Sequence, residues 1–139
     1  MGTQERLNNY LNSVRNEPFA WGHHDCLTFT NNAFKAMHGS GWADDLLGRY
    51  TDHDGAPIDR RNDLRRIFGY TKFDDAVDER LTRIGYVPPR GALVTTKHSQ
   101  RWVIGVAMGI SVGASAVFLS KQGLLYLPIE LIDMAWVRA

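Results

Sequence analysis

The sequence contains a single cysteine among its 139 residues, and this scarcity excludes one class of fold. A chain with one thiol cannot form an internal disulfide, so it is not a disulfide-stapled secreted domain. A reducing cytosol is the compartment that this count fits best. The fold must therefore be held by its apolar core, and 139 residues are enough to bury one.

Long apolar segments are also missing. The richest apolar run, residues 102–119, is interrupted by Gly105, Gly109 and Gly113, whereas a membrane-spanning helix needs roughly 18 consecutive apolar residues. The N-terminus MGTQERLNNYL has neither the basic start nor the apolar stretch of a secretory signal. We expect no membrane span and no signal peptide.

The sequence has no excess of charge of either sign, since its formal net charge is +1. The densest basic cluster, Arg60-Arg61 with Arg65-Arg66, is typical of a solvated helix face, so no nucleic-acid partner is predicted. The hydrophobic fraction of 44% and the charged fraction of 22% are those of an ordinary globular protein. Because no repeat or linker divides the chain, residues 1–139 are predicted to form one domain.

Two helices are predicted in the first 40 residues. Apolar residues recur at helical spacing over residues 7–14, and this helix ends before Pro18. Asp25 is a good N-cap, and the apolar stripe that starts at Cys26 predicts a second helix that stops at Gly39. Cys26 is therefore expected in the first turn of a helix that packs into the core.

The rest of the chain changes character once. Residues 43–50, 59–68 and 74–84 are polar and predict three short helices, with uncertain borders. From residue 90 onward, short runs rich in Val and aromatic residues alternate with Gly and Pro, which predicts an antiparallel sheet. Helices followed by strands indicate an α+β domain, with the N-terminal helices packed on a C-terminal antiparallel sheet.

The stretch PFAWGHHDCLTF concentrates the residues that could carry chemistry. The start of a helix lowers the pKa of a thiol through free amide groups and the helix dipole, so Cys26 is a candidate nucleophile. Two observations oppose this role. Asp25 would raise the pKa of a nearby thiol, and a cysteine on the apolar side of a helix is most often an inert core residue.

The order Trp21-Gly22, Asp25-Cys26, an apolar helix and a later sheet resembles the NlpC-type branch of the papain-like cysteine peptidases. That resemblance implies a papain-like fold with Cys26 as nucleophile and a histidine base at the start of a later strand. The segments RGALV and VIGVAMG are similar to the family's Gly-Asp strand and histidine-led strand. The ending GVAMGISVGASAVFLSKQGLLYLPIELIDMAWVRA resembles that of small NlpC-related proteins encoded among siphophage tail genes.

The catalytic dyad of that family is incomplete in this sequence. The resemblance places Val103 where the base histidine should be, and the Gly-Asp pair reads Gly91-Ala92. Valine can neither hold a thiolate nor protonate a leaving group. His98, five residues before Val103, is the remaining candidate base if a bulge or another register brings it to Cys26.

The neighbouring histidines and acids do not predict a metal site. His23, His24, Asp25 and Cys26 are all possible ligands, but consecutive residues rarely converge on one ion and no second pair accompanies them. His23 and His24 are interpreted as loop and capping residues, at least one of them directed outward. The motif DHD at residues 52–54 is interpreted as a surface turn. No metal and no cofactor is predicted.

The tryptophans leave one question open. Trp21 and Trp136 are expected to pack in the core or at its edge, because an aromatic side chain buries a large area. Trp42 and Trp102 could instead line a partner surface, where tryptophan is frequent. The sequence does not separate these alternatives.

Two functions follow from the residues and the resemblance. The first is a structural or assembly component of the distal phage tail, a pseudoenzyme on a degenerate NlpC-like fold whose partners are other tail proteins. Its location is then the virion, or the host cytoplasm during assembly. The second is an active cysteine amidase that cuts peptidoglycan stem peptides, with Cys26 as nucleophile and His98 as base. The missing histidine favours the first function, and the cysteine at the helix start favours the second.

Overall fold

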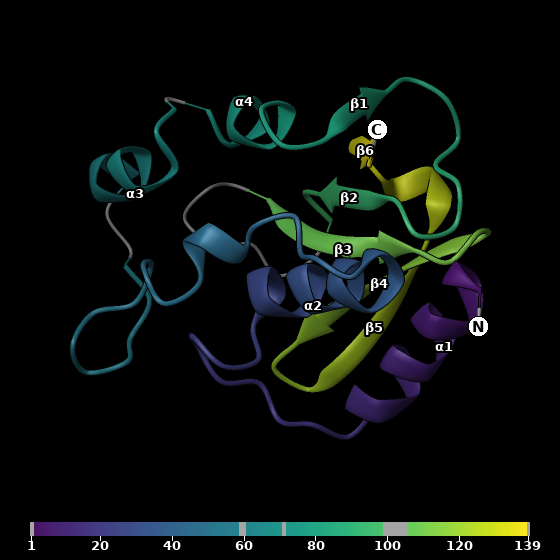
Figure 1. Cartoon of the computed structure of the whole chain (residues 1–139), viewed down its shortest axis with the longest axis horizontal. Coiled ribbons are helices and arrows are strands. Elements are labelled where there is room, and N and C mark those ends of the chain that lie inside the picture. The colour runs from purple at the N-terminus through teal and green to yellow at the C-terminus, as the bar shows by residue number, and fades with distance from the viewer. Residues whose placement is uncertain (1, 59–60, 71, 99–105, 139) are drawn as a thin grey trace.

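The computed structural model describes residues 2–58, 61–70, 72–98 and 106–138, which form an α+β domain (Figure 1). The helix α2 lies across the face of an antiparallel sheet, and α1 packs beside α2. The shorter helices α3 and α4 lie to one side of this layer pair (Figure 1). The predicted α+β class is therefore confirmed.

The first two helices begin and end close to the predicted residues. The helix α1 (Thr3–Val14) buries Leu7, Leu11 and Val14 on one face. The helix α2 (Cys26–His38) has Asp25 as its N-cap. It ends at Gly39, which adopts a left-handed conformation with φ of 88° and donates its N–H to the Lys35 carbonyl at 2.9 Å. A residue with a Cβ rarely adopts that conformation, which explains why the helix stops there.

The described strands form one antiparallel sheet with the order β1-β6-β2-β3-β4-β5. Its C-terminal location and antiparallel pairing confirm the prediction. Consecutive strands β2, β3, β4 and β5 are neighbours, and β6 returns to pair with β2 and β1. The strand bounds are β1 (Thr82–Ile84), β2 (Leu93–Thr96), β3 (Ala107–Ser111), β4 (Ser115–Ser120), β5 (Gly123–Pro128) and β6 (Met134–Val137).

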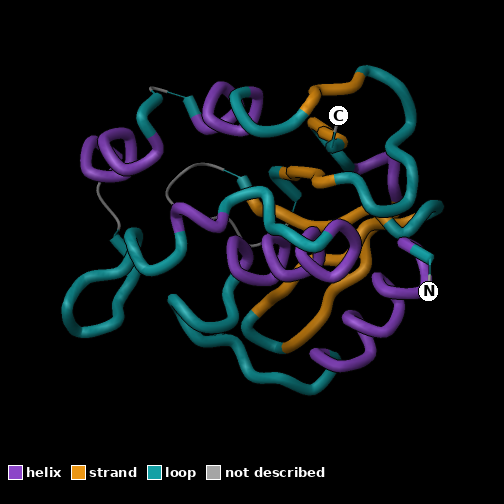
Figure 2. The backbone as a smooth tube through the Cα atoms, in the orientation of Figure 1, coloured by secondary structure: helices purple, strands orange, loops and turns teal. Residues whose placement is uncertain are grey.

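The helix predicted over residues 43–50 is wrong. Only the 3-10 turn η1 (Asp44–Leu46) forms there, and Figure 2 shows that the chain between α2 and α3 is mostly loop. The Asp44 carboxylate accepts hydrogen bonds from the Gly41 N–H at 2.9 Å and from the Asn31 amide at 2.8 Å. Local side-chain bonds of this kind compete with a helix, and Gly48 at φ of 80° ends the segment.

The helix predicted over residues 74–84 is too long. The helix α4 (Phe73–Asp78) stops early, and Thr82–Ile84 is the strand β1, paired with β6. A tertiary contact explains the change, since the Trp136 indole N–H of β6 donates to Oδ1 of Asp78 at 2.8 Å. The helix α3 (Arg61–Phe68) agrees with the predicted helix over the residues that the structure describes.

The main core lies between α2 and the strands β3 and β4. Trp136 has no exposed surface, and Trp21 packs partly buried against this core, as predicted. Trp42 is also buried, with 5% of its surface exposed, so it does not line a partner surface. Trp102 lies outside the described residues. In the part of the chain that the structure describes, no helix combines the length and apolar character needed to cross a bilayer.

Candidate functional site

A tight turn leads the chain into the candidate nucleophile. Ala20 and His24 form an isolated antiparallel bridge, and the His24 N–H donates to the Ala20 carbonyl at 2.7 Å. Gly22 occupies the turn at φ of 81°, where a side chain would be strained. The Gly22 N–H also donates to Oδ2 of Asp25 at 2.7 Å. The WGHHDC motif therefore forms a closed turn that fixes the direction in which α2 begins.

Asp25 caps the helix through a reciprocal capping box. Its Oδ1 accepts the N–H groups of Leu27 at 3.0 Å and Thr28 at 2.9 Å. The Thr28 hydroxyl in turn accepts the Asp25 N–H at 2.7 Å. These bonds satisfy main-chain donors that a helix start otherwise leaves free. The predicted role of Asp25 as an N-cap is confirmed.

The second oxygen of Asp25 receives a side-chain donor from a distant segment. The Tyr50 hydroxyl donates to Oδ2 at 2.6 Å, and neither residue has any exposed surface. Burial and the Asp25 carboxylate both raise the pKa of Tyr50 above its ordinary value, so Tyr50 remains a hydrogen-bond donor. The hydrogen bonds made by both carboxylate oxygens assign Asp25 a structural role rather than that of a base.

The Cys26 thiol is nearly closed off from solvent, with 9% of the residue exposed. Burial raises its pKa to about 12, and the Asp25 carboxylate acts in the same direction. The main-chain donors of Met108, Cys26 and Leu27 act in the opposite direction and lower the pKa without cancelling this rise. At neutral pH the sulfur is therefore a thiol, whereas the nucleophilic form of cysteine is the thiolate.

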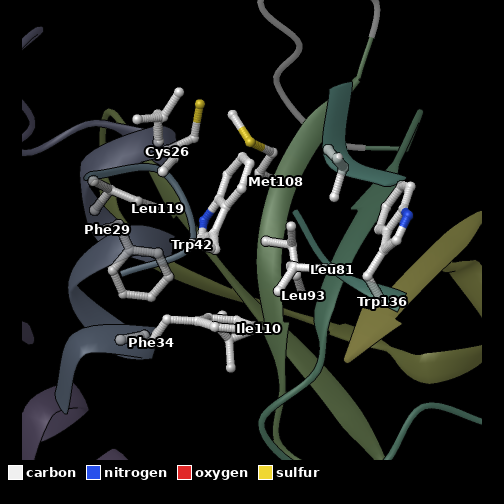
Figure 3. Packing of buried hydrophobic residues seen from close by; sticks show 14 of the residues in the cluster. Cys26, Phe29, Phe34, Trp42, Leu81, Leu93, Met108, Ile110, Leu119 and Trp136 are labelled. Atoms are coloured by element: carbon white, nitrogen blue, oxygen red, sulfur yellow. The ribbon is translucent and has the colours of Figure 1, made fainter. Parts of the chain in front are cut away.

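Met108 and Trp42 belong to the same buried cluster as Cys26. Figure 3 shows the Cys26 thiol and the Met108 thioether directed to the same end of the core, with the Trp42 indole beside them. Met108 lies on β3 and has no exposed surface. Trp42 is held by a 3.1 Å hydrogen bond from its indole N–H to the Thr30 hydroxyl. A thioether is at most a weak acceptor, so Met108 cannot serve as a base.

The two adjacent histidines have different surroundings. His23 is exposed, and His24 is 3% exposed, which agrees with the prediction that at least one of them points outward. The His24 ring meets Phe29 edge-on, with ring centroids 6.3 Å apart and planes at 88°. A contact between the residue before the N-cap and the fourth helical residue is the position of a hydrophobic staple. His24 therefore packs as part of the helix entry.

Two buried side-chain polar atoms of the described residues have no hydrogen-bond partner, His24 Nε2 and Thr95 Oγ1. Since His24 Nε2 is unpaired, it does not hold the Cys26 thiol. Thr95 pairs with Met108 across β2 and β3, next to the thiol. Neither atom supplies the base that a cysteine nucleophile requires.

The structure does not bring His98 and Cys26 into a described interaction. His98 follows β2 and is exposed, and its main-chain N–H donates to the Thr96 hydroxyl at 3.0 Å. In the residues that the structure covers, no hydrogen bond joins its imidazole to the thiol. The pairing of Cys26 with His98 stays a prediction. Val103, the residue at the expected histidine position, lies outside the described residues.

No metal site accompanies the cysteine in the described part of the chain, where no three His, Cys, Asp or Glu side chains cluster closely enough to hold an ion. The DHD motif is an exposed turn, as predicted. In it, Oδ1 of Asp52 accepts the N–H groups of Asp54 at 2.9 Å and Ala56 at 3.0 Å. These bonds account for the acidic residues there without a ligand.

Sequence reasoning missed Tyr50 and Met108 as neighbours of the site. Tyr50 is far from Asp25 in the chain, and nothing in the local pattern marks it as the partner of the cap. Met108 has a recoverable signal, because it lies in the predicted strand that follows the family's histidine position. If the strand had been predicted to begin at Ala107, as β3 does, Met108 would have been expected near Cys26.

Two comparisons with known proteins bear on this site. A family model described as "Domain of unknown function (DUF6950)" matches residues 2–137. No curated protein matches the chain.

Proposed function

The chain belongs to the DUF6950 family, a domain of unknown function, and we propose that it is a non-hydrolytic structural or assembly component of a phage tail. In this proposal the domain is a degenerate NlpC-type, papain-like fold that keeps the cysteine-bearing helix and has lost the chemistry. The single observation that carries the proposal is the burial of Cys26 in the core, with 9% of the residue exposed.

The loss of hydrolysis is supported by the surroundings of the thiol. A cysteine hydrolase needs a thiolate and a general acid within hydrogen-bond reach of it. Here burial raises the pKa of Cys26 to about 12. Met108 of the same buried cluster has a thioether, and the adjacent Asp25 carboxylate is already committed to the helix cap. Neither group can accept the thiol proton and return it to a leaving group.

The tail assignment is supported by the order of elements at the C-terminus. The strand β5 ends at Pro128, the 3-10 turn η2 (Ile129–Leu131) follows, and β6 carries Ala135-Trp136. That order is the one on which the resemblance to the small siphophage tail proteins rests. The buried Trp136 makes this ending part of the core.

One observation favours the alternative of a cysteine amidase that acts on peptidoglycan stem peptides. The main-chain donors of Met108, Cys26 and Leu27 each act to lower the pKa of the thiol. Donors in that arrangement could also stabilise an oxyanion beside the thiol. The amidase hypothesis requires His98 to reach Cys26 in the presence of substrate.

The experiment compares the two functions in a phage that carries this gene. We expect deletion of the gene to give defective tails, and a Cys26→Ala copy to restore them. The protein should also be found in purified virions or in tail intermediates. Absence from both, together with normal tails after deletion, would contradict the structural role.

A hydrolysis assay provides the second arm. Purified wild-type protein, Cys26→Ala and His98→Ala are incubated with muropeptides, and cleavage is followed by mass spectrometry. We expect no cleavage by any of the three proteins. Cleavage by the wild type that both substitutions abolish would establish the amidase instead.

A further inference from the structure

The strand β5 forms one edge of the described sheet. In the described sheet β5 lies at one end of the strand order and pairs only with β4. Its sequence GLLYLP carries no charge, and Leu125 and Tyr126 expose 38% and 53% of their surface. An edge strand directs half of its N–H and C=O groups away from the sheet. Among the strands that the structure describes, none pairs with these outward-facing groups.

The opposite edge shows how such a strand is normally protected. The strand β1 has three residues and carries Arg83, whose guanidinium pairs with Asp78 at 2.6 Å. Short length and charge both discourage strand addition. The strand β5 has six residues and neither form of protection.

A groove of about 340 Å³ opens beside Tyr126. The helix α1 forms one wall, and the loop before β2 and the turn between β3 and β4 form the other. Leu11 is 7% exposed and contributes an apolar surface. Val112 adds a second apolar side chain, and the other four lining residues offer amide, guanidinium and phenol groups. The groove is lined by Asn8, Leu11, Asn12, Arg90, Val112 and Tyr126.

Arg90 is the only charged residue of this lining, and its guanidinium is oriented before any ligand arrives. One nitrogen donates to the Val112 carbonyl at 2.9 Å, and another donates to Oδ1 of Asn8. None of the ion pairs found among the described residues involves Arg90. An arginine that is held by neutral acceptors retains its charge and further N–H donors for a carboxylate.

We propose that β5 and this groove bind an extended segment of a partner protein by strand addition, with an Asp or Glu side chain of that segment reaching Arg90. Main-chain bonds to β5 supply the affinity, and the charge of Arg90 selects the residue. Tyr126 is the fourth of six strand residues, so the added strand continues on both sides of the groove. A side-chain carboxylate therefore fits this site, rather than the C-terminus of the partner.

The inference does not depend on the chemistry at Cys26. The groove contains no residue of the cysteine site, so failure of either proposal leaves the other in place.

The test uses the full chain and three libraries of hexapeptides, two of which are acetylated and amidated at their ends. These two libraries have Thr or Val at the other positions and differ only at the third position, which is Glu in one and Gln in the other. A third library has Gln and a free C-terminal carboxylate. Binding is followed by the amide resonances of the protein in ¹⁵N-labelled form, which also locate the site.

We expect the Glu library to bind about tenfold more tightly than the Gln library, because a charge-assisted bond to arginine replaces a neutral one. The peptides with a free C-terminal carboxylate should bind no more tightly than the amidated Gln peptides. The largest changes in amide chemical shift should occur at Leu124, Leu125 and Tyr126. Arg90→Gln should abolish the preference for Glu, and Arg90→Lys should retain part of it.

Lys121→Gln is the matched control, since Lys121 is exposed in the turn that leads into β5 and carries the same charge. It should leave the preference for Glu unchanged. Absence of binding, equal binding of the Glu and Gln libraries, or shifts that map away from β5 would each overturn the proposal. A preference for Glu that survives Arg90→Gln would overturn it as well.

Discussion

The hydroxyl of Tyr50 donates a 2.6 Å hydrogen bond to Oδ2 of Asp25 and so ties the loop after η1 to the first turn of α2. Both residues are fully buried. A hydrogen bond to a carboxylate is stronger than one between neutral groups, and a buried carboxylate that loses a donor is destabilised. The position of Cys26 therefore depends on a contact between segments 25 residues apart.

Tyr50→Phe should lower the free energy of unfolding by about 1–3 kcal/mol, because it removes a charge-assisted donor from a buried acceptor. Urea unfolding followed by circular dichroism measures the change. Tyr86→Phe is the control, since Tyr86 is 65% exposed and should be neutral. In a double-mutant cycle with Asp25→Asn the two changes should not be additive. Full additivity would show that the bond contributes nothing.

Stability should fall at alkaline pH. Burial and Asp25 raise the pKa of Cys26 to about 12 from an ordinary value of 9.0, and the same two causes raise that of Tyr50 from 10.0. The folded protein thus holds protons that the unfolded chain releases, so the stabilisation is complete below pH 9 and lost as pH rises towards the folded values.

Each group contributes a slope of about 1.4 kcal/mol per pH unit within its own window. Urea midpoints from pH 7 to pH 11 provide the measurement. Above pH 10 the free energy of unfolding of Tyr50→Phe should fall less steeply with pH than that of the wild type, because one titrating group is removed. Equal slopes would contradict the raised pKa of Tyr50.

Met108→His should partly activate the thiol. The main chain of Met108 acts to lower the pKa of Cys26, and its thioether and the thiol point to the same end of the core. An imidazolium there would favour the thiolate and lower the pKa of Cys26. We expect alkylation of the folded protein at pH 8 to become about tenfold faster or more. Met108→Leu is the control and should leave the rate unchanged. Equal rates in both variants would show that Met108 does not face the thiol.

Gly109→Ala should destabilise the sheet. A Cβ at Gly109 would lie 2.5 Å from the Val117 carbonyl oxygen and 2.6 Å from a ring carbon of Phe118. Overpacking against a backbone atom costs about 1–3 kcal/mol, which thermal or urea unfolding can detect. Gly85→Ala is the matched control, because a Cβ there meets no atom within 4 Å. Similar midpoints for the two variants would contradict the close approach of β3 and β4.

The local signals of the first two helices were readable from the sequence. Asp25 before an apolar stripe and Gly39 after it are physical requirements of helix ends, and the structure has both. Residues 43–50 and 82–84 were misassigned because tertiary contacts decided them. Asp44 accepts a hydrogen bond from the Asn31 amide of α2 instead of continuing a helix, and Thr82–Ile84 pairs with β6.

The candidate site was predictable only in part. The position of Cys26 at the start of a helix followed from its neighbours, whereas the lost chemistry that the missing histidine favours stays a prediction. The burial of the thiol could not be predicted from the sequence, because Tyr50 and Met108 come close to the site only in the folded chain. Residues that are distant in sequence meet by packing, and no local pattern records that contact.

The pH dependence of Cys26 alkylation in the folded protein tests the central claim most directly. The chain has one cysteine, so the mass gained with iodoacetamide reports this thiol alone. A closed thiol with a pKa of about 12 predicts negligible reaction from pH 7 to pH 9 and rapid reaction in urea. A native thiol that titrates below 9.0, the ordinary value of cysteine, would contradict the closed site and favour the amidase.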